Sequence, residues 1–441
     1  MPSVIVAGGG LAGLAAAAAL GSAGFRVDVF ESRAFLGGRA TSYEAPGNAG
    51  PPETIDNCQH VLLRCCVNLL DFYGRLGVSG HVRFFRQFVF LEPGGRASIL
   101  RAGVLPAPLH FAGSFAALKF LGLRDKLRIA RAMLAIRRER STRTDLDRIS
   151  MLDWLREKRQ TPRAIRRFWG QVLVSAINEE LDRMAARHGF QVFWLGFLAR
   201  PDSYEMGVPA VPLGELYSSH AWDQIGNVTL HLRAPVERLE MENGRVRCAI
   251  AGGGEHGADF YVAAVPFERL AALAPGAGIP VPAFTHSPIT GIHLWFDRGI
   301  TGLPNATLLD RTIQWMYNKS DGRYVQLVVS ASRALLDMPR QEVIALALRE
   351  LAEFFPAVLD ATLVKAHVVK EVRATFSAAP GTEQLRPETR SATPNLFLAG
   401  DWTQSGWPAT MEGAVRSGYL AAEAISAAAG EPHRFLLPDI A

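Results

Sequence analysis

Cysteine is scarce in this chain of 441 residues, which contains only Cys58, Cys65, Cys66 and Cys248. Their spacing fits neither a disulfide framework nor a zinc site, so we predict a reducing compartment and no bound metal. Uninterrupted apolar runs of 18 residues are also missing, so no membrane-spanning helix is predicted. No basic segment of a secretory signal precedes the first strand, and we therefore expect a cytoplasmic protein.

Charge of one sign does not dominate, because 47 Lys and Arg stand against 42 Asp and Glu, a formal net charge of +5. The basic residues are densest between positions 124 and 167. Such a cluster can meet nucleic acid, an acidic substrate or anionic lipid, or it can simply face solvent. We find no nucleic-acid-binding module and predict no nucleic acid partner, which leaves anionic lipid and solvent as the two alternatives.

What the chain does have is length and apolar residues, 49% of the total. A chain longer than about 300 residues ordinarily divides into two domains. Strand and helix patterns are interleaved, so we predict two discontinuous domains in an α/β fold. One is a Rossmann-like nucleotide-binding domain and the other an α+β substrate domain; the predicted segments are 1–80, 205–285 and 385–430 for the first and 81–204 and 286–384 for the second.

A glycine-rich turn, Gly8-Gly9-Gly10-Leu11-Ala12-Gly13, separates a strand predicted at 3–7 from an alanine-rich helix predicted at 11–23. It contains the pattern G-x-G-x-x-G, and the strand predicted at 26–31 ends in an acidic residue, Glu31. A glycine turn, a helix and an acidic residue about 20 positions on are typical of a dinucleotide site.

Each residue of the turn has a chemical reason. Gly8 permits the tight turn, Gly10 lets backbone amides approach a pyrophosphate, and Gly13 allows the helix to pack closely on the strand. The helix N-terminus offers unpaired N–H groups to the anion. Glu31 can accept hydrogen bonds from both ribose hydroxyls, which favours an adenosine without a 2′-phosphate.

Three further segments resemble those of the flavin amine oxidase and carotenoid desaturase superfamily. Gly37-Gly38-Arg39 follows Glu31 in the pattern E-x5-G-G-R, Arg233 to Val236 resembles the adenine-binding segment, and Leu398 to Ala414 resembles the second FAD segment. The resemblance implies FAD in a fold of glutathione reductase or amine oxidase type, bound non-covalently because no cysteine follows Cys248. The residues implied to bind FAD are Gly8, Gly10, Leu11, Ala12, Gly13, Glu31, Ser32, Gly38, Arg39, Val236, Gly400, Asp401, Pro408, Thr410 and Met411.

Two other segments resemble the squalene-associated enzymes of hopanoid synthesis, the hydroxysqualene dehydroxylase family. Ile55 to Leu63 resembles their D-N-G-Q-H segment, with Cys58 in place of the glycine, and Ser175 to Asp182 resembles their A-L-N-x-x-x-D stretch. The resemblance implies that reduced flavin delivers hydride from N5 to the allylic cation left when the protonated hydroxyl departs, which gives squalene. An apolar C30 isoprenoid is then the substrate.

This reaction needs a general acid, for which His60, Glu179 and Asp56 are the candidates. Each has an alternative without chemistry: Asp56 can cap a turn, His60 can be a hydrogen-bonded core histidine, and Glu179 can be a surface charge. The substrate also needs an apolar tunnel. The aromatic residues available for it, most of which we expect to serve only in core packing, are Phe168, Trp169, Phe190, Phe193, Trp194, Phe197, Trp295 and Trp315. Residues 105–140, apolar at first and then basic, predict a peripheral contact with the inner face of the cytoplasmic membrane.

Three other functions are compatible with the FAD motifs. An amine oxidase of the same superfamily is disfavoured, because no aromatic pair can be placed as an amine cage. A carotenoid or phytoene-type desaturase transfers hydride in the opposite direction, although this chain is shorter than is usual for those enzymes. A non-catalytic isoprenoid carrier resembling the Rab GDP-dissociation inhibitors needs no flavin, so intact FAD motifs disfavour it. No second G-x-G-x-x-G is present, so the electrons of the dehydroxylation reaction come from NAD(P)H bound transiently or from a partner protein.

Overall fold

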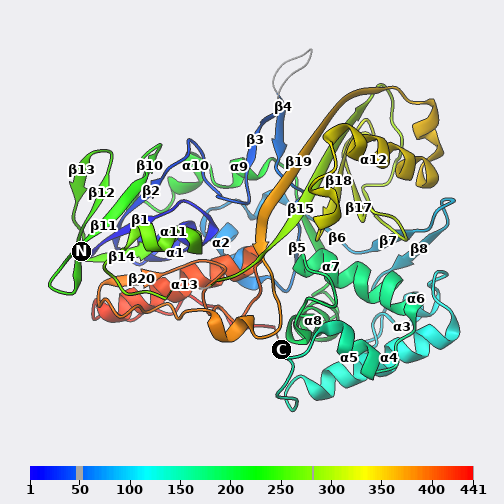
Figure 1. Cartoon of the computed structure of the whole chain (residues 1–441), viewed down its shortest axis with the longest axis horizontal. Helices are drawn as coiled ribbons and strands as arrows, with labels where there is room; N and C mark the ends of the chain where they lie inside the picture. Colours follow the sequence, from blue (N-terminus) through cyan, green and yellow to red (C-terminus); the bar gives the residue numbers. More distant parts are fainter. Residues whose placement is uncertain (46–52, 281–282, 441) are drawn as a thin grey trace.

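The computed structural model describes residues 1–45, 53–280 and 283–440. Residues 46–52 and 281–282, which belong to the segments predicted for the nucleotide-binding domain, lie outside the described residues. The predicted α/β class is confirmed: two large sheets, each with its own helices, lie side by side in the molecule (Figure 1).

The first sheet is parallel and has the strand order β10-β2-β1-β14-β20. Helix α1 (Leu11–Ser22) is buried along nearly its whole length, and α13 (Met411–Ala428) packs against it. A Cβ on Gly418 of α13 would lie 2.2 Å from the carbonyl oxygen of Ala12, so the small residues of the two helices let their backbones approach closely. The strands are β1 (Ser3–Ala7), β2 (Arg26–Glu31), β10 (Val228–Leu232), β14 (Phe260–Ala263) and β20 (Leu396–Leu398).

The first sheet carries several smaller elements. Apolar side chains of a three-stranded antiparallel sheet share a core with Ile5 and Tyr261 of the parallel sheet. The smaller elements are the sheet strands β11 (Val236–Glu242), β12 (Arg245–Ala251) and β13 (Gly254–His256), the hairpin β3 (Ser42–Ala45) and β4 (Glu53–Asp56), and helices α2 (Val67–Arg75), α9 (Leu213–Leu216), α10 (Ser219–Trp222) and α11 (Phe267–Leu273).

The second sheet has seven strands in the order β19-β15-β18-β17-β16-β7-β8 and is antiparallel except where β16 meets β7. Helix α12 (Arg340–Phe354) covers one face, because its buried Val343, Ala347 and Leu351 share a core with strand residues. The strands are β7 (Phe88–Leu91), β8 (Ala97–Leu100), β15 (His286–Phe296), β16 (Asn305–Leu308), β17 (Trp315–Ser320), β18 (Tyr324–Ser330) and β19 (Leu363–Phe376).

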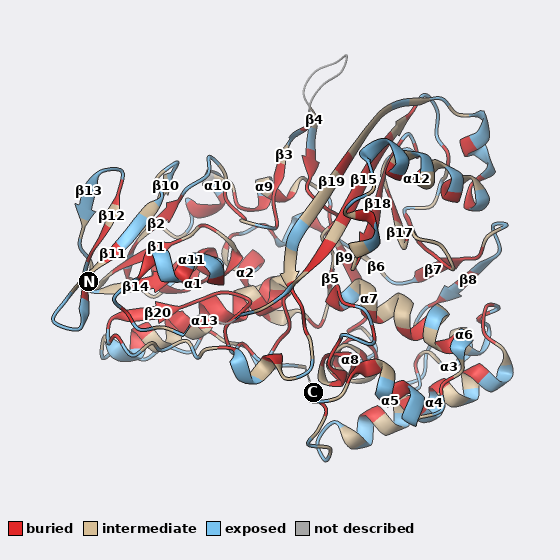
Figure 2. Cartoon of the chain, viewed as in Figure 1, coloured by how far each residue is buried: buried red, intermediate tan, exposed pale blue. Residues whose placement is uncertain are grey.

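A helical layer lies beyond the second sheet and forms the lower right of Figures 1 and 2. Its core contains Trp154, Trp169 and Phe193, which are buried together with residues of β7 and β8. The helices are α3 (Ala112–Ala116), α4 (Leu123–Glu139), α5 (Met151–Glu157), α6 (Pro162–Ala164), α7 (Gln171–Ile177) and α8 (Ala186–Phe193), with π-helical turns at Ile165–Gly170 and Trp194–Leu198. Within the described ranges, no helix has the length and apolar character needed to cross a bilayer.

A small sheet joins the two regions of the chain. Strand β9 (Met206–Pro209) pairs with both β5 (Leu62–Leu63) and β6 (Val82–Phe85). The apolar run Val61-Leu62-Leu63 contains the strand β5, and the chain becomes helical only at Val67. Three consecutive apolar residues show no periodicity that distinguishes a strand from a helix, so the pairing with β9 determines the strand.

Candidate functional site

The glycine turn between β1 and α1 is built from three glycines with different duties. Gly8 has a φ of +117°, and a Cβ there would lie 2.5 Å from the carbonyl oxygen of Ala264. A Cβ on Gly13 would lie 2.0 Å from the carbonyl oxygen of Gly8. A Cβ on Gly10 would meet nothing nearer than Gly38 Cα, at 3.9 Å. Gly8 and Gly13 thus serve the fold, whereas Gly10 borders open space.

Glu31, at the end of β2, braces this turn. One carboxylate oxygen accepts the N–H of Gly9 at 2.8 Å, and the other accepts the N–H of Arg33 at 2.8 Å and the hydroxyl of Ser32 at 3.0 Å. The backbone N–H of Ala234 donates to the carbonyl of Glu31, which places the start of β11, at Val236, nearby. Two segments about 200 residues apart in the sequence therefore meet at the end of β2.

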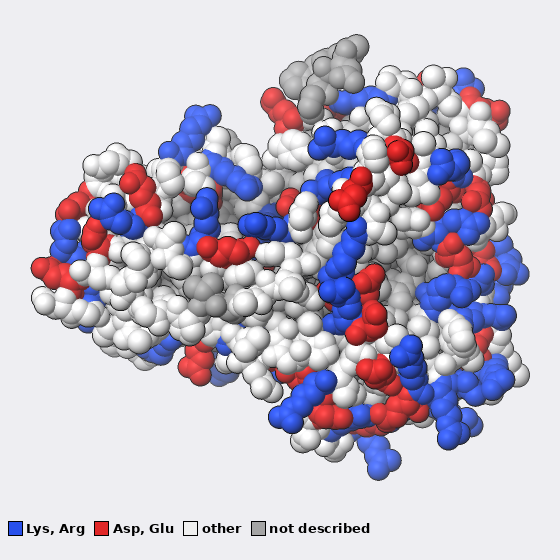
Figure 3. Space-filling model, in the orientation of Figure 1, with Lys and Arg blue, Asp and Glu red and all other residues white. Residues whose placement is uncertain are grey.

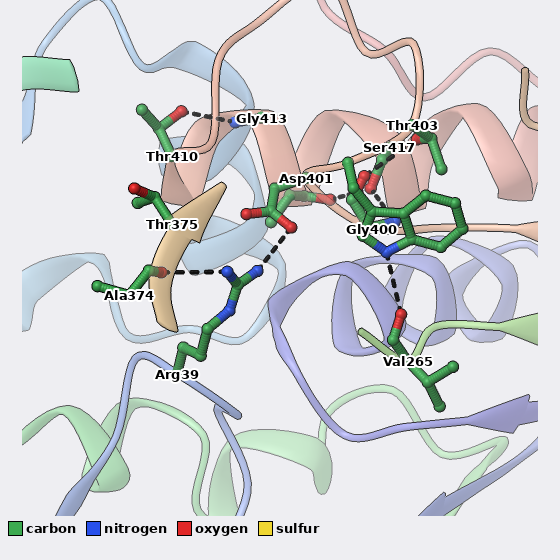
Figure 4. A network of polar contacts seen from close by, with 12 residues as sticks. Arg39, Val265, Ala374, Thr375, Gly400, Asp401, Thr403, Thr410, Gly413 and Ser417 are labelled. Carbon is green, nitrogen blue, oxygen red and sulfur yellow. Dashed lines mark hydrogen bonds and ion pairs between the residues drawn. The ribbon is translucent and has the colours of Figure 1, made fainter. Parts of the chain in front are cut away.

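The Gly37-Gly38-Arg39 turn lies against the glycine turn, because Gly37 N–H donates to the carbonyl of Gly9 at 2.8 Å. Arg39 then reaches the C-terminal segment (Figure 4): its Nη2 lies 2.6 Å from Asp401 Oδ1, and its Nη1 donates to the carbonyl of Ala374 at 3.1 Å. The ion pair joins the two sequence motifs that carry the FAD resemblance.

The C-terminal segment turns from β20 into α13 on two further hydrogen bonds. Gly400 N–H donates to Ser417 Oγ at 2.8 Å, and Gly413 N–H donates to Thr410 Oγ1 at 3.1 Å (Figure 4). Thr410 is thereby the N-cap of an 18-residue helix. The N-terminal residues of this helix and of α1 line the same cavity, and the unpaired N–H groups and positive dipole end of each helix suit a bound anion.

One cavity of about 910 Å³ brings the predicted cofactor residues together. This is at the upper end of the roughly 300–1,000 Å³ range of small-molecule sites. Gly13 packs below the turn and does not line the cavity. Those that do are Gly8, Gly10, Leu11, Ala12, Glu31, Ser32, Gly38, Arg39, Val236, Gly400, Asp401, Pro408, Thr410 and Met411.

The geometry of the cavity fits a dinucleotide in two respects. The space in front of Gly10 is open to a pyrophosphate, as its missing Cβ contact shows. Asn57 donates through Nδ2 to the carbonyl of Arg39 at 2.9 Å, but its buried Oδ1, on the cavity wall, accepts from no described residue. A buried acceptor of this kind requires a donor, which a bound cofactor can supply.

The same cavity continues into an apolar chamber between the second sheet and the helical layer. Of the aromatic residues predicted to form a tunnel, only Phe197 and Trp315 line it. The other six do not line it, as expected for most of this set: Trp169 and Phe193, for example, are buried in the helical core. The apolar residues of the chamber wall include Phe88, Phe90, Leu100, Val172, Leu195, Phe197, Met206, Ile289, Trp315 and Val328.

Two polar side chains of the chamber wall were not foreseen from the sequence. Thr307 Oγ1 is buried and has no hydrogen-bond partner among the described residues. Tyr317 is buried, and burial raises the pKa of its phenol well above the usual value, so it is a neutral hydroxyl. Neither lies in a motif, and only the pairing of β16 with β17 brings them to one wall.

His60 lines the cavity, as a general acid must. Its Nδ1 lies 2.9 Å from the carbonyl oxygen of Cys58, which can only accept, so Nδ1 carries the hydrogen. Nε2 is then the atom that gains or loses a proton. Burial lowers the pKa of His60, while the nearby carboxylate of Asp56 partly opposes this shift.

Asp56 is buried but does not border the cavity. Its Oδ1 accepts the hydroxyl of Ser42 at 2.7 Å and the N–H of Leu213, the first residue of α9, at 2.9 Å. Its Oδ2 lies 3.7 Å from Lys319 Nζ. The structure thus favours the capping role for Asp56. Its carboxylate also acts on His60, whose pKa it raises.

Glu179 is fully buried, so its reading as a surface charge is wrong. Its two oxygens accept from Arg333 at 2.7 and 2.8 Å, and Ser377 also donates to it. It does not line the cavity, whereas its neighbour Asn178 does. Asn178 ends α7 in a left-handed conformation with a φ of +59°, which turns Glu179 away from the chamber and toward β19.

Glu412, in the first turn of α13, is a cavity residue that sequence reasoning missed. Its carboxylate accepts the N–H groups of Asn68 at 3.2 Å and Leu69 at 2.7 Å, in the first turn of α2. Burial raises its pKa to about 7. The signal was present in the Met411-Glu412-Gly413 motif, but only the structure shows that this glutamate ties two helices together.

A family model described as "Flavin containing amine oxidoreductase" matches residues 11–426 of this chain. One similar protein is the 15-cis-phytoene desaturase of Synechococcus elongatus, 26% identical over 98% of this chain and 97% of its own length. The chain is shorter than the plant desaturases, as expected, since it covers 77% of the 15-cis-phytoene desaturase of Solanum lycopersicum at 26% identity, but it is not shorter than the Synechococcus enzyme.

Solved structures share the fold over nearly the whole chain. An oxidoreductase from Methanosarcina mazei superposes with a TM-score of 0.72 at 18% identity, covering 95% of this chain and 99% of its own. A putrescine oxidase bound to putrescine superposes with a TM-score of 0.68 at 16% identity, covering 97% and 99%. At this identity the likeness extends to the fold and not to the substrate.

Proposed function

Since the chain belongs to the flavin-containing amine oxidoreductase family, we propose that it reductively removes the hydroxyl group of hydroxysqualene, which gives squalene. The single observation that supports this proposal best is the continuity of the cavity. The FAD-binding motifs and a chamber walled by apolar side chains border the same space, so an isoprenoid chain can lie against the cofactor.

FAD is the cofactor. Gly10 would leave room for its pyrophosphate, the N-terminal residues of α1 and α13, which line the cavity, would stabilise its anionic groups, and Glu31 would bind the ribose. When bound and reduced, FAD supplies two electrons as a hydride. The protein holds it non-covalently, since no cysteine follows Cys248.

The chain must bind the substrate hydroxyl and give it a proton, because hydroxide is a poor leaving group. In the proposed reaction the protonated Nε2 of His60 donates to the hydroxyl oxygen, the allylic C–O bond breaks, and water leaves. A hydride from bound, reduced FAD would complete the new C–H bond, so the overall change would consume one hydride and one proton. Burial, which lowers the pKa of His60, makes its imidazolium a stronger acid.

Tyr317 and Thr307 are suited to orient the hydroxyl in an otherwise apolar chamber. Both side chains line the wall, and Thr307 Oγ1 is buried without a partner in the described residues. An apolar substrate with a single hydroxyl leaves most of the wall in apolar contact and satisfies such a group. The aromatic faces of Trp315 and Phe88 can stabilise the allylic cation.

Product analysis tests the reaction. Purified holoenzyme is incubated with hydroxysqualene and a chemical reductant without oxygen, and the products are identified by mass spectrometry. We expect squalene, in an amount that depends on both reductant and enzyme. Heat-denatured enzyme with added free FAD and reductant is the control, and squalene formed there at the same rate would contradict the proposal.

The full-length likeness to a phytoene desaturase supports a second candidate, a desaturase that removes hydride from an isoprenoid chain. The same apolar chamber would hold that substrate. Incubation with phytoene and a quinone oxidant distinguishes the two: new conjugated double bonds there, with hydroxysqualene unchanged under reducing conditions, would establish desaturation. The carrier alternative gains no support from a chain whose FAD cavity is complete.

A further inference from the structure

Apolar side chains that face solvent are gathered on the loop after β8 and on α4. Leu123, Leu127 and Leu134 of α4 are 75%, 53% and 64% exposed. Their spacing of four and seven residues puts them on one side of the helix. Val104, Leu105 and Leu109 of the loop are also exposed, and Lys126 Nζ donates to the carbonyl of Ala116, which holds the end of α3 against α4. We call these six apolar residues and α4 the docking face.

Positive charge accompanies the leucines. Arg124, Arg131 and Arg138 recur every seven residues on the exposed side of α4. None of the three forms an ion pair with a residue in the described parts of the chain. Figure 3 shows basic side chains over this helical layer at the lower right. Arginines beside exposed leucines give α4 the two properties that interfacial helices combine.

Negative charge is nearly absent from the same stretch. Between residues 97 and 138 the sequence has one acidic residue, Asp125. It is buried and accepts the hydroxyl of Thr161 at 2.5 Å. An anionic surface therefore meets no exposed carboxylate on α4 before Glu139.

The second half of the basic cluster behaves differently. Arg143 pairs with Asp145 at 2.6 Å and with Glu157 at 2.8 Å, Lys158 pairs with Glu139, and Arg167 pairs with Glu92 at 3.0 Å. These ion pairs hold the elements of the helical layer together, so these basic residues have a structural role and are not available to bind lipid. Arg148 and Arg159 have no ion pair within the described residues, but most of the uncompensated charge of the cluster belongs to α4.

The docking face lies on the outside of the chamber. The inner side of α4, with Ile129 and Ile136, shares one apolar core with Phe88 and Leu100, which line the cavity. The chain passes from Leu100, on the cavity wall, to the fully exposed Val104 within four residues. The docking face and the chamber therefore border the same apolar core from opposite sides.

We propose that the docking face binds the surface of an anionic phospholipid bilayer and that the chamber takes its substrate from there. The second half of this statement rests on the proposed function, whereas the first does not. Leucines enter the headgroup boundary, and the arginines meet lipid phosphates. Every group involved is already on the surface, so binding requires no unfolding.

Flotation with vesicles tests the binding step with the holoenzyme. We expect binding to vesicles of phosphatidylcholine with phosphatidylglycerol and much weaker binding to phosphatidylcholine alone. The triple variant Leu123→Ser, Leu127→Ser, Leu134→Ser should bind at least roughly tenfold more weakly. Leu359→Ser with Val364→Ser removes two equally exposed apolar side chains elsewhere and should bind as the wild type does.

A second variant, Arg124→Gln with Arg131→Gln and Arg138→Gln, tests the charge. Binding to the anionic vesicles should fall roughly 100-fold and should lose most of its salt dependence. Equal binding by all variants would overturn the proposal. So would a leucine variant that binds vesicles normally but changes from dimer to monomer, since the face would then join two copies of the chain.

Activity separates this proposal from the proposed function. With substrate in detergent micelles, the leucine variant should retain wild-type turnover, whereas with substrate in anionic vesicles its turnover should fall in parallel with its binding. If vesicle binding follows the predictions but hydroxysqualene is not converted by any variant in either medium, the docking face is supported and the assigned reaction is wrong.

Discussion

The two ends of the cavity are made in different ways. The nucleotide end is a series of backbone turns, in which the turns at Gly8, Gly37 and Gly400 are held by hydrogen bonds between main-chain groups and a few fixed side chains. The apolar chamber is a collection of side chains from separate strands and helices that share no local pattern. The first end therefore recognises a fixed cofactor, whereas the second can adapt to a substrate by exchange of single side chains.

Blocking the nucleotide end should have the largest effect. Gly10 has a φ of −77°, and its missing Cβ faces open space, so Gly10→Val is expected to fold while filling the pyrophosphate position. We expect FAD affinity to fall by at least about 100-fold, or about 2.7 kcal/mol. Flavin content after gel filtration measures this. Gly80→Val is the control and should keep its flavin, because a Cβ added at Gly80 would meet no other residue within 4 Å.

Blocking the apolar chamber should give the opposite pattern. Val172→Trp places a large ring in the chamber, far in sequence from every FAD motif. We expect full flavin content and turnover of the C30 substrate reduced by roughly 100-fold or more, because the ring occupies space that the substrate needs. Loss of flavin in this variant would show that the two ends are not separable.

His60→Gln should keep FAD and reduce turnover by roughly 100-fold, within the range of general acid catalysis. In the wild type the imidazolium is populated only below the lowered pKa of His60, so kcat/KM should fall as pH rises above that value. The variant should lose this slope. A wild-type pH profile in the variant would remove His60 from the reaction and leave it as a hydrogen-bonded core histidine.

Tyr317→Phe should have a smaller effect. Deleting one hydrogen bond to the substrate hydroxyl should lower kcat/KM by roughly tenfold. Flavin content and thermal stability should not change, since the Tyr317 hydroxyl forms no hydrogen bond with any of the described residues. An equal loss for a substrate analogue without the hydroxyl, measured as binding, would contradict the assigned role.

Glu412, which ties α13 to α2, is expected to have the smallest effect on turnover, because its contribution is to stability. Its folded pKa of about 7 lies above the unfolded value, so its proton stabilises the fold at low pH, and that contribution is lost as pH rises from about 4.5 to 7. Thermal melting of flavin-free wild type and Glu412→Gln across this range checks the prediction. The melting temperature of the wild type should decline relative to that of the variant, and parallel curves would contradict it.

The unequal construction of the two ends also explains what could be predicted from the sequence. Glycines at 8, 10 and 13 and Glu31 belong to one strand–turn–helix unit, so spacing alone places them. Thr307 and Tyr317 reach the chamber through pairing between strands, which no local pattern records. Glu179 also could not be placed from local sequence. A charged residue just after a helix is usually predicted to be on the surface, and only the structure shows that Glu179 is buried against Arg333 and Ser377.

A single-turnover experiment tests the joint use of the two ends most directly. Holoenzyme is reduced under anaerobic conditions, freed of excess reductant and mixed with hydroxysqualene, while flavin absorbance and squalene are followed together. We predict that oxidised flavin returns and that one squalene forms for each flavin, with both signals lost in Val172→Trp. Flavin that stays reduced in the presence of hydroxysqualene, in a wild-type enzyme that binds it, would contradict the proposed reaction.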